Sequence, residues 1–153
     1  MTRVKICGIT SAEDALAAVE AGADAIGLIF VPGTPRFVHP EAAPGILRGL
    51  PPFVSIVGVF LDQPLEEVLR IAAGLGLHAV QLHGHESEAF SRGVPLPVIK
   101  ALRVRDAESL RPIASYPARA FLLDAYVEGR PGGTGTRMSW ELAVQAKGRT
   151  PII

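Results

Sequence analysis

The chain has one cysteine, Cys7, and no asparagine, and only three of its 15 basic residues are lysines. A single cysteine excludes an internal disulfide, so the thiol serves either packing or chemistry. The absence of asparagine, together with 13 prolines, fits a heat-adapted protein with stiff loops. A GC-rich genome gives the same composition, so both explanations stay open.

An excess of charge of either sign is also missing, because 15 acidic residues balance the 15 basic ones. Without a basic block, no nucleic-acid partner is expected. The apolar runs have the length of strands, which predicts no membrane partner. The chain does not open with a charged segment followed by an apolar one, so no secretory signal is expected and the predicted location is the cytoplasm.

Strand and helix patterns alternate along the whole chain. Apolar runs without strict alternation are typical of parallel strands buried on both faces. The predicted strands are Arg3–Ile9, Ala25–Phe30, Val54–Phe60, Ala79–His83, Val98–Val104 and Ala120–Tyr126. The predicted helices are Ser11–Ala21, Glu41–Leu50, Leu65–Leu75, Glu86–Arg92, Ala107–Tyr116 and Ser139–Lys147. Ser11 is a candidate N-cap, and Gly22, Gly76 and Gly148 are candidate C-caps.

Six consecutive βα units predict right-handed crossovers and a parallel sheet. The first strand is not followed by Gly-x-Gly-x-x-Gly, which argues against a dinucleotide fold. Polar residues at the ends of several strands favour a (βα)8 TIM barrel. Pro151-Ile152-Ile153 has the pattern of a seventh strand, whereas a complete barrel needs roughly 200 residues. The sequence therefore predicts one TIM-barrel domain over residues 1–153 that is C-terminally incomplete. The first strand would then keep an unpaired edge, which favours association. We also expect residues 1–153 alone to have little activity.

Charged and polar residues interrupt three of the apolar strands. Because side chains alternate between the two faces of a strand, Lys5 shares a face with Cys7, and Gln81 shares one with His83. Asp124 likewise shares a face with Leu122. Buried polar groups are unfavourable unless they are paired or used. We therefore expect a polar cluster at the carboxyl ends of the strands, serving either structure or catalysis.

The motifs that carry these residues match a known family. Lys5-Ile6-Cys7-Gly8-Ile9-Thr10, Pro35-Arg36, Val80-Gln81-Leu82-His83-Gly84, Leu123-Asp124-Ala125 and Gly132-Gly133-Thr134-Gly135 stand in that order along the chain. Together they resemble phosphoribosylanthranilate isomerase, a (βα)8-barrel enzyme of tryptophan biosynthesis. The last two βα units of that family have no counterpart here.

The resemblance implies an Amadori rearrangement of N-(5-phosphoribosyl)anthranilate to 1-(2-carboxyphenylamino)-1-deoxyribulose 5-phosphate. It assigns the general base to Cys7 and the general acid to Asp124. The substrate-binding residues that it implies are Lys5, Arg36, Gln81, His83, Gly133 and Gly135. Arg36 would hold the anthranilate carboxylate, and the glycine-rich loop would contact phosphate. The chemistry needs neither a cofactor nor a metal, so the expected partner is a small phosphorylated substrate.

Less specific interpretations of the same residues remain. Lys5 would help to ionise the Cys7 thiol by stabilising the thiolate. Burial would raise the pKa of Asp124, whereas the Lys5 ammonium would lower it. Arg36 is otherwise a solvated loop residue, His83 a core histidine and Asp124 a structural carboxylate. The alternative functions are a Schiff-base aldolase using Lys5 or Lys100, and a non-catalytic barrel fragment. A homodimer is left open.

Overall fold

The computed structural model describes residues 2–126, 140–147 and 150–153. Its centre is a sheet of six strands in chain order, each parallel to its neighbours. The strands are β1 (Lys5–Cys7), β2 (Ala25–Ile29), β3 (Ser55–Phe60), β4 (Ala79–Leu82), β5 (Val98–Val104) and β6 (Ala120–Ala125). The predicted parallel α/β fold is confirmed.

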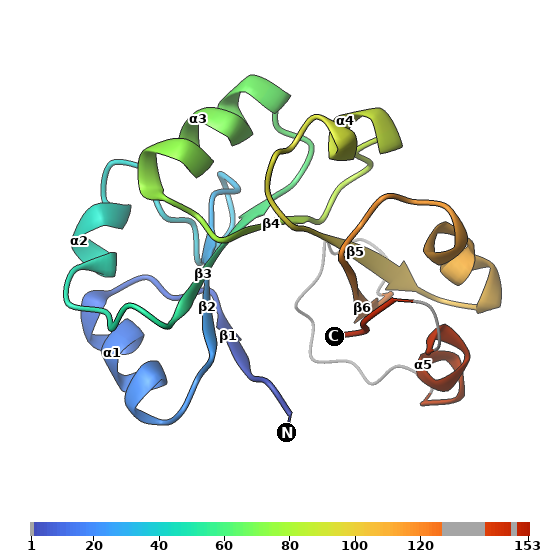
Figure 1. Cartoon of the computed structure of the whole chain (residues 1–153), viewed down its shortest axis with the longest axis horizontal. Helices are drawn as coiled ribbons and strands as arrows, with labels where there is room; N and C mark the ends of the chain where they lie inside the picture. The colour runs from blue at the N-terminus through green and yellow to red at the C-terminus, as the bar shows by residue number, and fades with distance from the viewer. Residues whose placement is uncertain (1, 127–139, 148–149) are drawn as a thin grey trace.

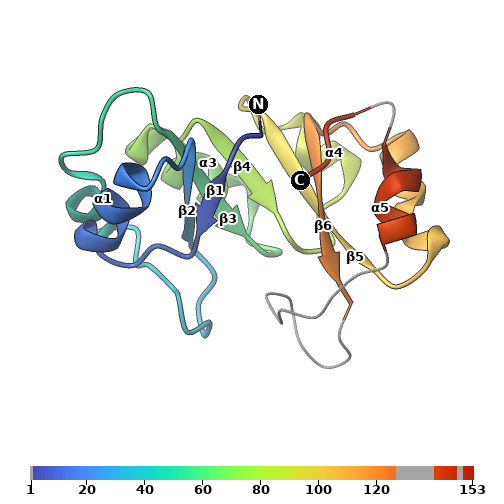
Figure 2. The same ribbon diagram turned by 90° about the horizontal axis from the view of Figure 1, so that it is seen from below.

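Helices follow the strands and lie around the outer side of the curved sheet (Figure 1). They are α1 (Ala12–Glu20), α2 (Ala43–Leu47), α3 (Leu65–Leu75), α4 (Glu88–Arg92), the 3-10 helix η1 (Ala107–Ala114) and α5 (Trp140–Ala146). Viewed from the side, the sheet curls with β1 and β6 at its two edges (Figure 2). This curvature turns one face of every strand toward a common interior.

Two of the predicted helix ends depend on caps that the structure shows. The side chain of Ser11 accepts a hydrogen bond from the Asp14 amide at 3.0 Å, which satisfies a free N–H of the first turn of α1. Gly76 ends α3 with φ +60°, a left-handed conformation that a glycine adopts without strain. Gly22 also has a positive φ just after α1, whereas Gly148 lies outside the described residues.

Several predicted elements were too long. β1 begins at Lys5 rather than Arg3 and ends at Cys7 rather than Ile9, because Gly8 adopts a φ of +85° and breaks the strand. α2 has five residues, without a side-chain cap and with a proline in its first turn. The predicted helix at 107–116 is a 3-10 helix that contains Pro112, which cannot donate an α-helical hydrogen bond.

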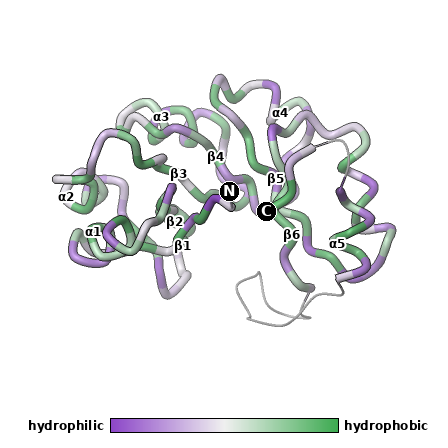
Figure 3. The backbone as a smooth tube through the Cα atoms, turned by 60° about the horizontal axis from the view of Figure 1, so that its bottom comes forward, coloured by the Kyte–Doolittle hydropathy of each residue, from purple (hydrophilic) through white to green (hydrophobic). Residues whose placement is uncertain are grey.

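The main hydrophobic core lies between the sheet and the helices. Every second residue of the strands points toward the helices and contributes to this core. Examples are Ile26, Leu28, Phe60, Val80 and Leu82. They pack against helix residues such as Ala15, Val68 and Ile71. Figure 3 shows hydrophobic residues running through the strands, while the helices mix hydrophobic and hydrophilic residues. The remaining strand residues point to the opposite, inner face of the curved sheet.

The predicted start of a seventh strand is confirmed. Ile152 forms a parallel bridge with Phe121 of β6. The Ile153 amide donates to the Phe121 carbonyl at 2.8 Å, and the Leu123 amide donates to the Ile153 carbonyl at 3.0 Å. The chain therefore continues the order of the sheet beyond β6.

Candidate active site

The sheet register places the predicted polar residues on one face. Residues paired across parallel strands point the same way, and Cys7 pairs with Gly27, Gln81 with Ile99, and Asp124 with Arg103. These residues alternate with the outward-facing core residues, so they face the interior of the curved sheet. The predicted shared faces of Lys5 with Cys7, Gln81 with His83, and Leu122 with Asp124 agree with this register.

A chain of polar contacts crosses the interior from β1 to β6. Lys5 Nζ donates to Gln81 Oε1 at 2.5 Å, and Gln81 Nε2 lies 3.3 Å from His83 Nδ1. His83 Nε2 lies 3.4 Å from Asp124 Oδ2. Three strands that are not adjacent in the sheet are thus connected through four side chains.

The donors in this chain fix the tautomer of a neutral His83. A lysine ammonium can only donate, so the oxygen of the Gln81 amide faces Lys5 and its NH2 group faces His83. Nδ1 of His83 must then accept, which leaves the ring proton on Nε2. That proton is directed toward the side of Asp124.

The contact between His83 and Asp124 has the distance of an ion pair but not the geometry of a hydrogen bond. Among the described residues, His83 Nε2 is a buried atom without a hydrogen-bond partner. The side chains of His83 and Asp124 are 15% and 18% exposed. A buried donor that lacks a hydrogen bond, beside a slightly exposed carboxylate, is suited to bind a polar ligand atom.

Two glycines make room for Cys7 and Arg36. A Cβ on Gly27 would lie 2.8 Å from Cys7 Sγ, and a Cβ on Gly8 would lie 2.5 Å from Arg36 Nη1. Arg36 Nη1 donates to the Cys7 carbonyl at 2.9 Å. This bond uses one of the five N–H donors of the guanidinium. The cation predicted to bind a carboxylate is thereby anchored to the residue that carries the thiol.

The structure brings together Lys5, Gln81, His83 and Asp124 by contact, and Cys7 with Arg36 beside them on the same end of the sheet. The described hydrogen bond of the Lys5 ammonium goes to Gln81 rather than to Cys7. Gly133 and Gly135 lie outside the described residues, so their predicted phosphate contact stays a prediction.

Sequence reasoning missed Arg103 and Gly27. Arg103 is paired in register with Asp124 at the carboxyl end of β5, and strand parity alone could have found it. Arg103 also lines an open pocket of about 430 Å³. The other lining residues are His85, Arg105, Asp106, Glu108, Ser109 and Tyr126. A glycine inside a strand is a known sign of close approach, which could have indicated Gly27.

Lys100, the alternative Schiff-base residue, faces the other way. It alternates with Ile99 and Ala101 and therefore points to the outer layer, where its side chain is 7% exposed and ion-paired with Glu86. It is not placed to form an imine with a substrate in the interior.

Within the described part of the chain, no three His, Cys, Asp or Glu residues gather as metal ligands. None of the described helices combines the length and hydropathy needed to cross a bilayer.

Comparison with known proteins gives one consistent result. The family model of N-(5'phosphoribosyl)anthranilate (PRA) isomerase matches residues 4–152. The N-(5'-phosphoribosyl)anthranilate isomerase of Citrifermentans bemidjiense is 55% identical over 153 residues, which are 100% of this chain and 74% of that protein.

Solved structures agree with the sequence comparison. The phosphoribosyl anthranilate isomerase of Thermus thermophilus superposes with a TM-score of 0.86 at 43% identity, over 95% of this chain and 71% of its own. A second, 44% identical with a TM-score of 0.78 over 82% of this chain and 66% of its own, is a complex with reduced 1-(o-carboxyphenylamino)-1-deoxyribulose 5-phosphate. A third, from Thermotoga maritima, is described as monomers generated from a dimeric enzyme; it is 42% identical, with a TM-score of 0.76 over 82% of this chain and 64% of its own.

Proposed function

The chain belongs to the N-(5'-phosphoribosyl)anthranilate isomerase family, and on that premise we propose that Cys7 is the general base and Asp124 the general acid of its reaction. The activity is the isomerisation of phosphoribosylanthranilate in tryptophan biosynthesis, on a TIM-barrel scaffold. What remains to be assigned is which side chain performs each proton transfer.

The Amadori rearrangement needs an acid and a base on either side of one sugar. The acid protonates the ring oxygen of the furanose, which opens to a Schiff base. The base then removes the proton from C2, and the resulting enolamine becomes the ketone. Cys7 and Asp124 stand at the carboxyl ends of β1 and β6, the first and last strands of the described sheet. Curvature of the sheet lets these strands face each other across the interior.

The observation that carries this proposal is the polar chain from Lys5 through Gln81 and His83 to Asp124. It places the Asp124 carboxyl group beside an imidazole that is linked through Gln81 to Lys5, on the strand of Cys7. Turnover of N-(5-phosphoribosyl)anthranilate, followed by the fluorescence of its anthranilate group, tests the assignment in variants at positions 7 and 124. Undiminished turnover in both variants would refute it.

Arg36 is proposed to bind the anthranilate carboxylate. Its guanidinium is exposed, lies against Gly8 and is anchored to the Cys7 carbonyl. A planar guanidinium binds a carboxylate through two parallel hydrogen bonds. The proposed phosphate contacts of Gly133 and Gly135 rest on the sequence motif alone.

Arg36→Met is expected to raise KM by about ten- to a hundredfold, since a charge-assisted pair contributes about 1.5–3 kcal/mol. The kcat of the variant should change much less, because the carboxylate lies away from the reacting carbon atoms. Steady-state kinetics measure both constants. Arg70→Met, a second exposed position, serves as the control, and an unchanged KM in Arg36→Met would exclude the contact.

A homodimer is proposed as the assembly. Phe53 is 96% exposed and follows Pro51 and Pro52, which stiffen its loop. A second copy of the chain would remove this ring from water, and the Thermotoga maritima relative is described as dimeric. Phe53 lies before β3 at the end of the sheet opposite the candidate site, so pairing there leaves the site open. The cytoplasmic location stays a prediction.

Phe53→Glu is expected to convert the dimer to a monomer, because a carboxylate cannot be buried at the contact without a partner. Light scattering coupled to size-exclusion chromatography measures the mass, and the Michaelis constants should stay unchanged. Val144→Glu, at a residue that is 64% exposed on α5, is the control and should remain dimeric. A dimeric Phe53→Glu protein would rule out this surface.

A further inference from the structure

A second cluster of charges lies behind the candidate site, on the outer face of the same strands. Lys100 Nζ donates to Glu86 Oε2 at 2.9 Å, to the Gly84 carbonyl at 2.6 Å and to the Leu82 carbonyl at 3.4 Å. An ammonium group has three protons, so all three have acceptors. The side chains of Lys100 and Glu86 are only 7% and 2% exposed, and neither has a role in the proposed proton transfers.

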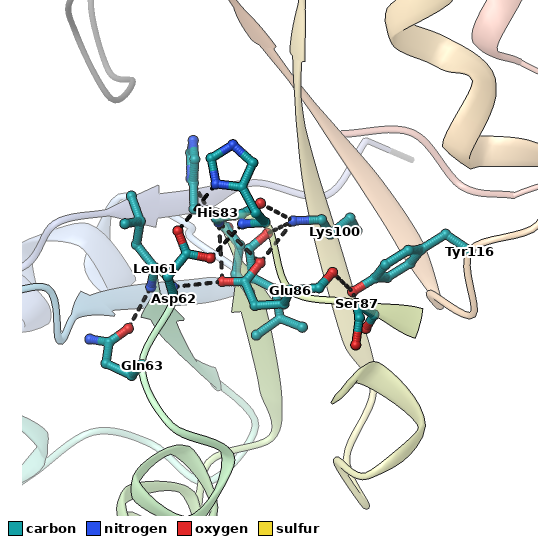
Figure 4. Close-up of polar contacts among 12 residues, drawn as sticks. Leu61, Asp62, Gln63, His83, Glu86, Ser87, Lys100 and Tyr116 are labelled. Atoms are coloured by element: carbon teal, nitrogen blue, oxygen red, sulfur yellow. Dashed lines mark hydrogen bonds and ion pairs between the residues drawn. The ribbon is translucent and has the colours of Figure 1, made fainter. Parts of the chain in front are cut away.

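The carboxylate of Glu86 is also fully used. Its Oε1 atom accepts from the amides of Asp62 at 3.0 Å and Gly84 at 3.1 Å. Its Oε2 atom accepts from the Gly84 amide at 3.0 Å and from Lys100. Figure 4 shows these contacts converging on Glu86 from the loop of Asp62, from Lys100 and from the segment of His83.

The atoms that the pair holds flank His83 on both sides. Lys100 binds the carbonyls before and after it, and Glu86 binds the amide that follows it. The His83 amide itself donates to the Phe60 carbonyl at 2.8 Å. The backbone on either side of His83 is thus fixed from the outer face, while its imidazole reaches Gln81 and Asp124 on the inner face.

Neighbouring contacts tighten the same segment. Asp62 Oδ1 accepts from the His85 amide at 2.5 Å, and a side chain on Gly84 would collide with the Asp62 carboxylate. Burial raises the pKa of Asp62, but hydrogen bonds from the His85 amide and imidazole outweigh it and lower the pKa overall. Tyr116 donates to the carbonyls of Glu86 and Ser87, and burial raises the pKa of this phenol, which keeps its proton.

Stability alone is a poor explanation for such a pair. Removing two charges from water carries a large desolvation penalty, and apolar replacements of buried pairs are often neutral or stabilising. Fixed geometry at a catalytic centre is a better explanation, since small displacements there reduce turnover strongly.

We propose that Lys100 and Glu86 are positioning residues that set His83 against Asp124 from the opposite face of the sheet. This inference rests on the proposed role of Asp124 as the acid. The pair contacts no substrate; it acts through the backbone of residues 82–84. Its loss is expected to lower kcat more than it raises KM.

The test compares two double variants of matched chemistry. Lys100→Met/Glu86→Gln removes the buried pair and keeps an amide that can bind the Gly84 N–H. Arg92→Met/Glu88→Gln removes an ion pair of the same length, 2.9 Å, that is exposed on α4. The first should lose about ten- to a hundredfold in kcat, measured well below its melting temperature. The second should keep the kcat of the wild type.

The imidazole resonances of His83, assigned with a His83→Gln variant, provide a readout other than activity. They should move in Lys100→Met/Glu86→Gln and stay in place in the control. If that variant does not fold, Asp62→Asn perturbs the same segment from a partly exposed position and should give a smaller change in the same direction. A folded variant with normal kcat, or with unmoved His83 resonances, would overturn the proposal.

Asp124→Asn separates this proposal from the one on which it rests. If that variant turns over normally, the acid assignment fails, whatever the resonances show. If it is inactive while Lys100→Met/Glu86→Gln matches the exposed-pair control in kcat or in His83 resonances, the positioning role alone fails.

Discussion

Cys7→Ser is expected to reduce kcat by about 10²- to 10⁴-fold, the usual contribution of a positioned general base. Serine is nearly isosteric but far less acidic than a thiol, so it cannot form the anion that removes the C2 proton. Arg36 keeps its anchor, because it binds the backbone carbonyl of residue 7 and not the side chain. Substrate affinity should therefore be kept, as binding and steady-state measurements on the same preparation would show.

The single thiol gives this prediction an independent control. Because Cys7 is the only cysteine, iodoacetamide modifies one defined sulfur. Inactivation of the wild type should follow its alkylation and be slowed by a product analogue. Cys7→Ser should keep its small remaining activity under the same treatment. A kcat close to that of the wild type in Cys7→Ser would return Cys7 to a packing role.

Asp124→Asn is expected to slow ring opening and to reduce kcat by about 10²- to 10⁴-fold as well. The amide keeps the shape of the carboxyl group but cannot deliver an acidic proton to the sugar oxygen. The His83 imidazole still has a polar neighbour at about the same place, so the fold should be retained. Single-turnover kinetics together with a thermal melt distinguish loss of chemistry from loss of structure.

Asp106→Asn is the matched control for this substitution. Asp106 caps η1 by accepting from the Ser109 amide and hydroxyl, and these hydrogen bonds lower its pKa. Asparagine is as good an N-cap as aspartate, so both stability and kcat should stay close to those of the wild type. If Asp124→Asn unfolds while the folded fraction keeps normal kcat, Asp124 is a structural carboxylate.

The sequence predicted the inner face of the sheet well because strand geometry is local. A period of two places Lys5 with Cys7 and Gln81 with His83 whatever the surrounding fold. The caps at Ser11 and Gly76 are equally local. The predicted helix over 41–50 was too long, since α2 ends at Leu47 and Gly49 adopts a φ of +84°. The helix type at 107–114 was wrong because Pro112 cannot donate the hydrogen bond of an α-helix.

Contacts between loop residues and strands could not be derived in this way. Glu86 was placed at the start of a helix, yet α4 begins at Glu88, and the Glu86 carboxylate pairs with Lys100 of β5. The contact depends on how two loops and a strand meet, which no local pattern contains. A lysine within the apolar run Val98–Val104 was the one available sign that a buried partner exists.

One charged cluster lies on the inner face of the sheet and the other on its outer face. This arrangement limits where residues can be inserted into the chain or deleted from it. His83 directly follows β4 and Lys100 lies in the adjacent strand β5, but their side chains face opposite sides of the sheet. Deleting one residue inside β4 or β5 would exchange the two sides of that strand, sending ionic groups into the apolar layer and aliphatic ones into the interior. Insertions and deletions should therefore be tolerated better in an exposed connection at the far end of the sheet, such as 48–52 between α2 and β3, where neither cluster is disturbed.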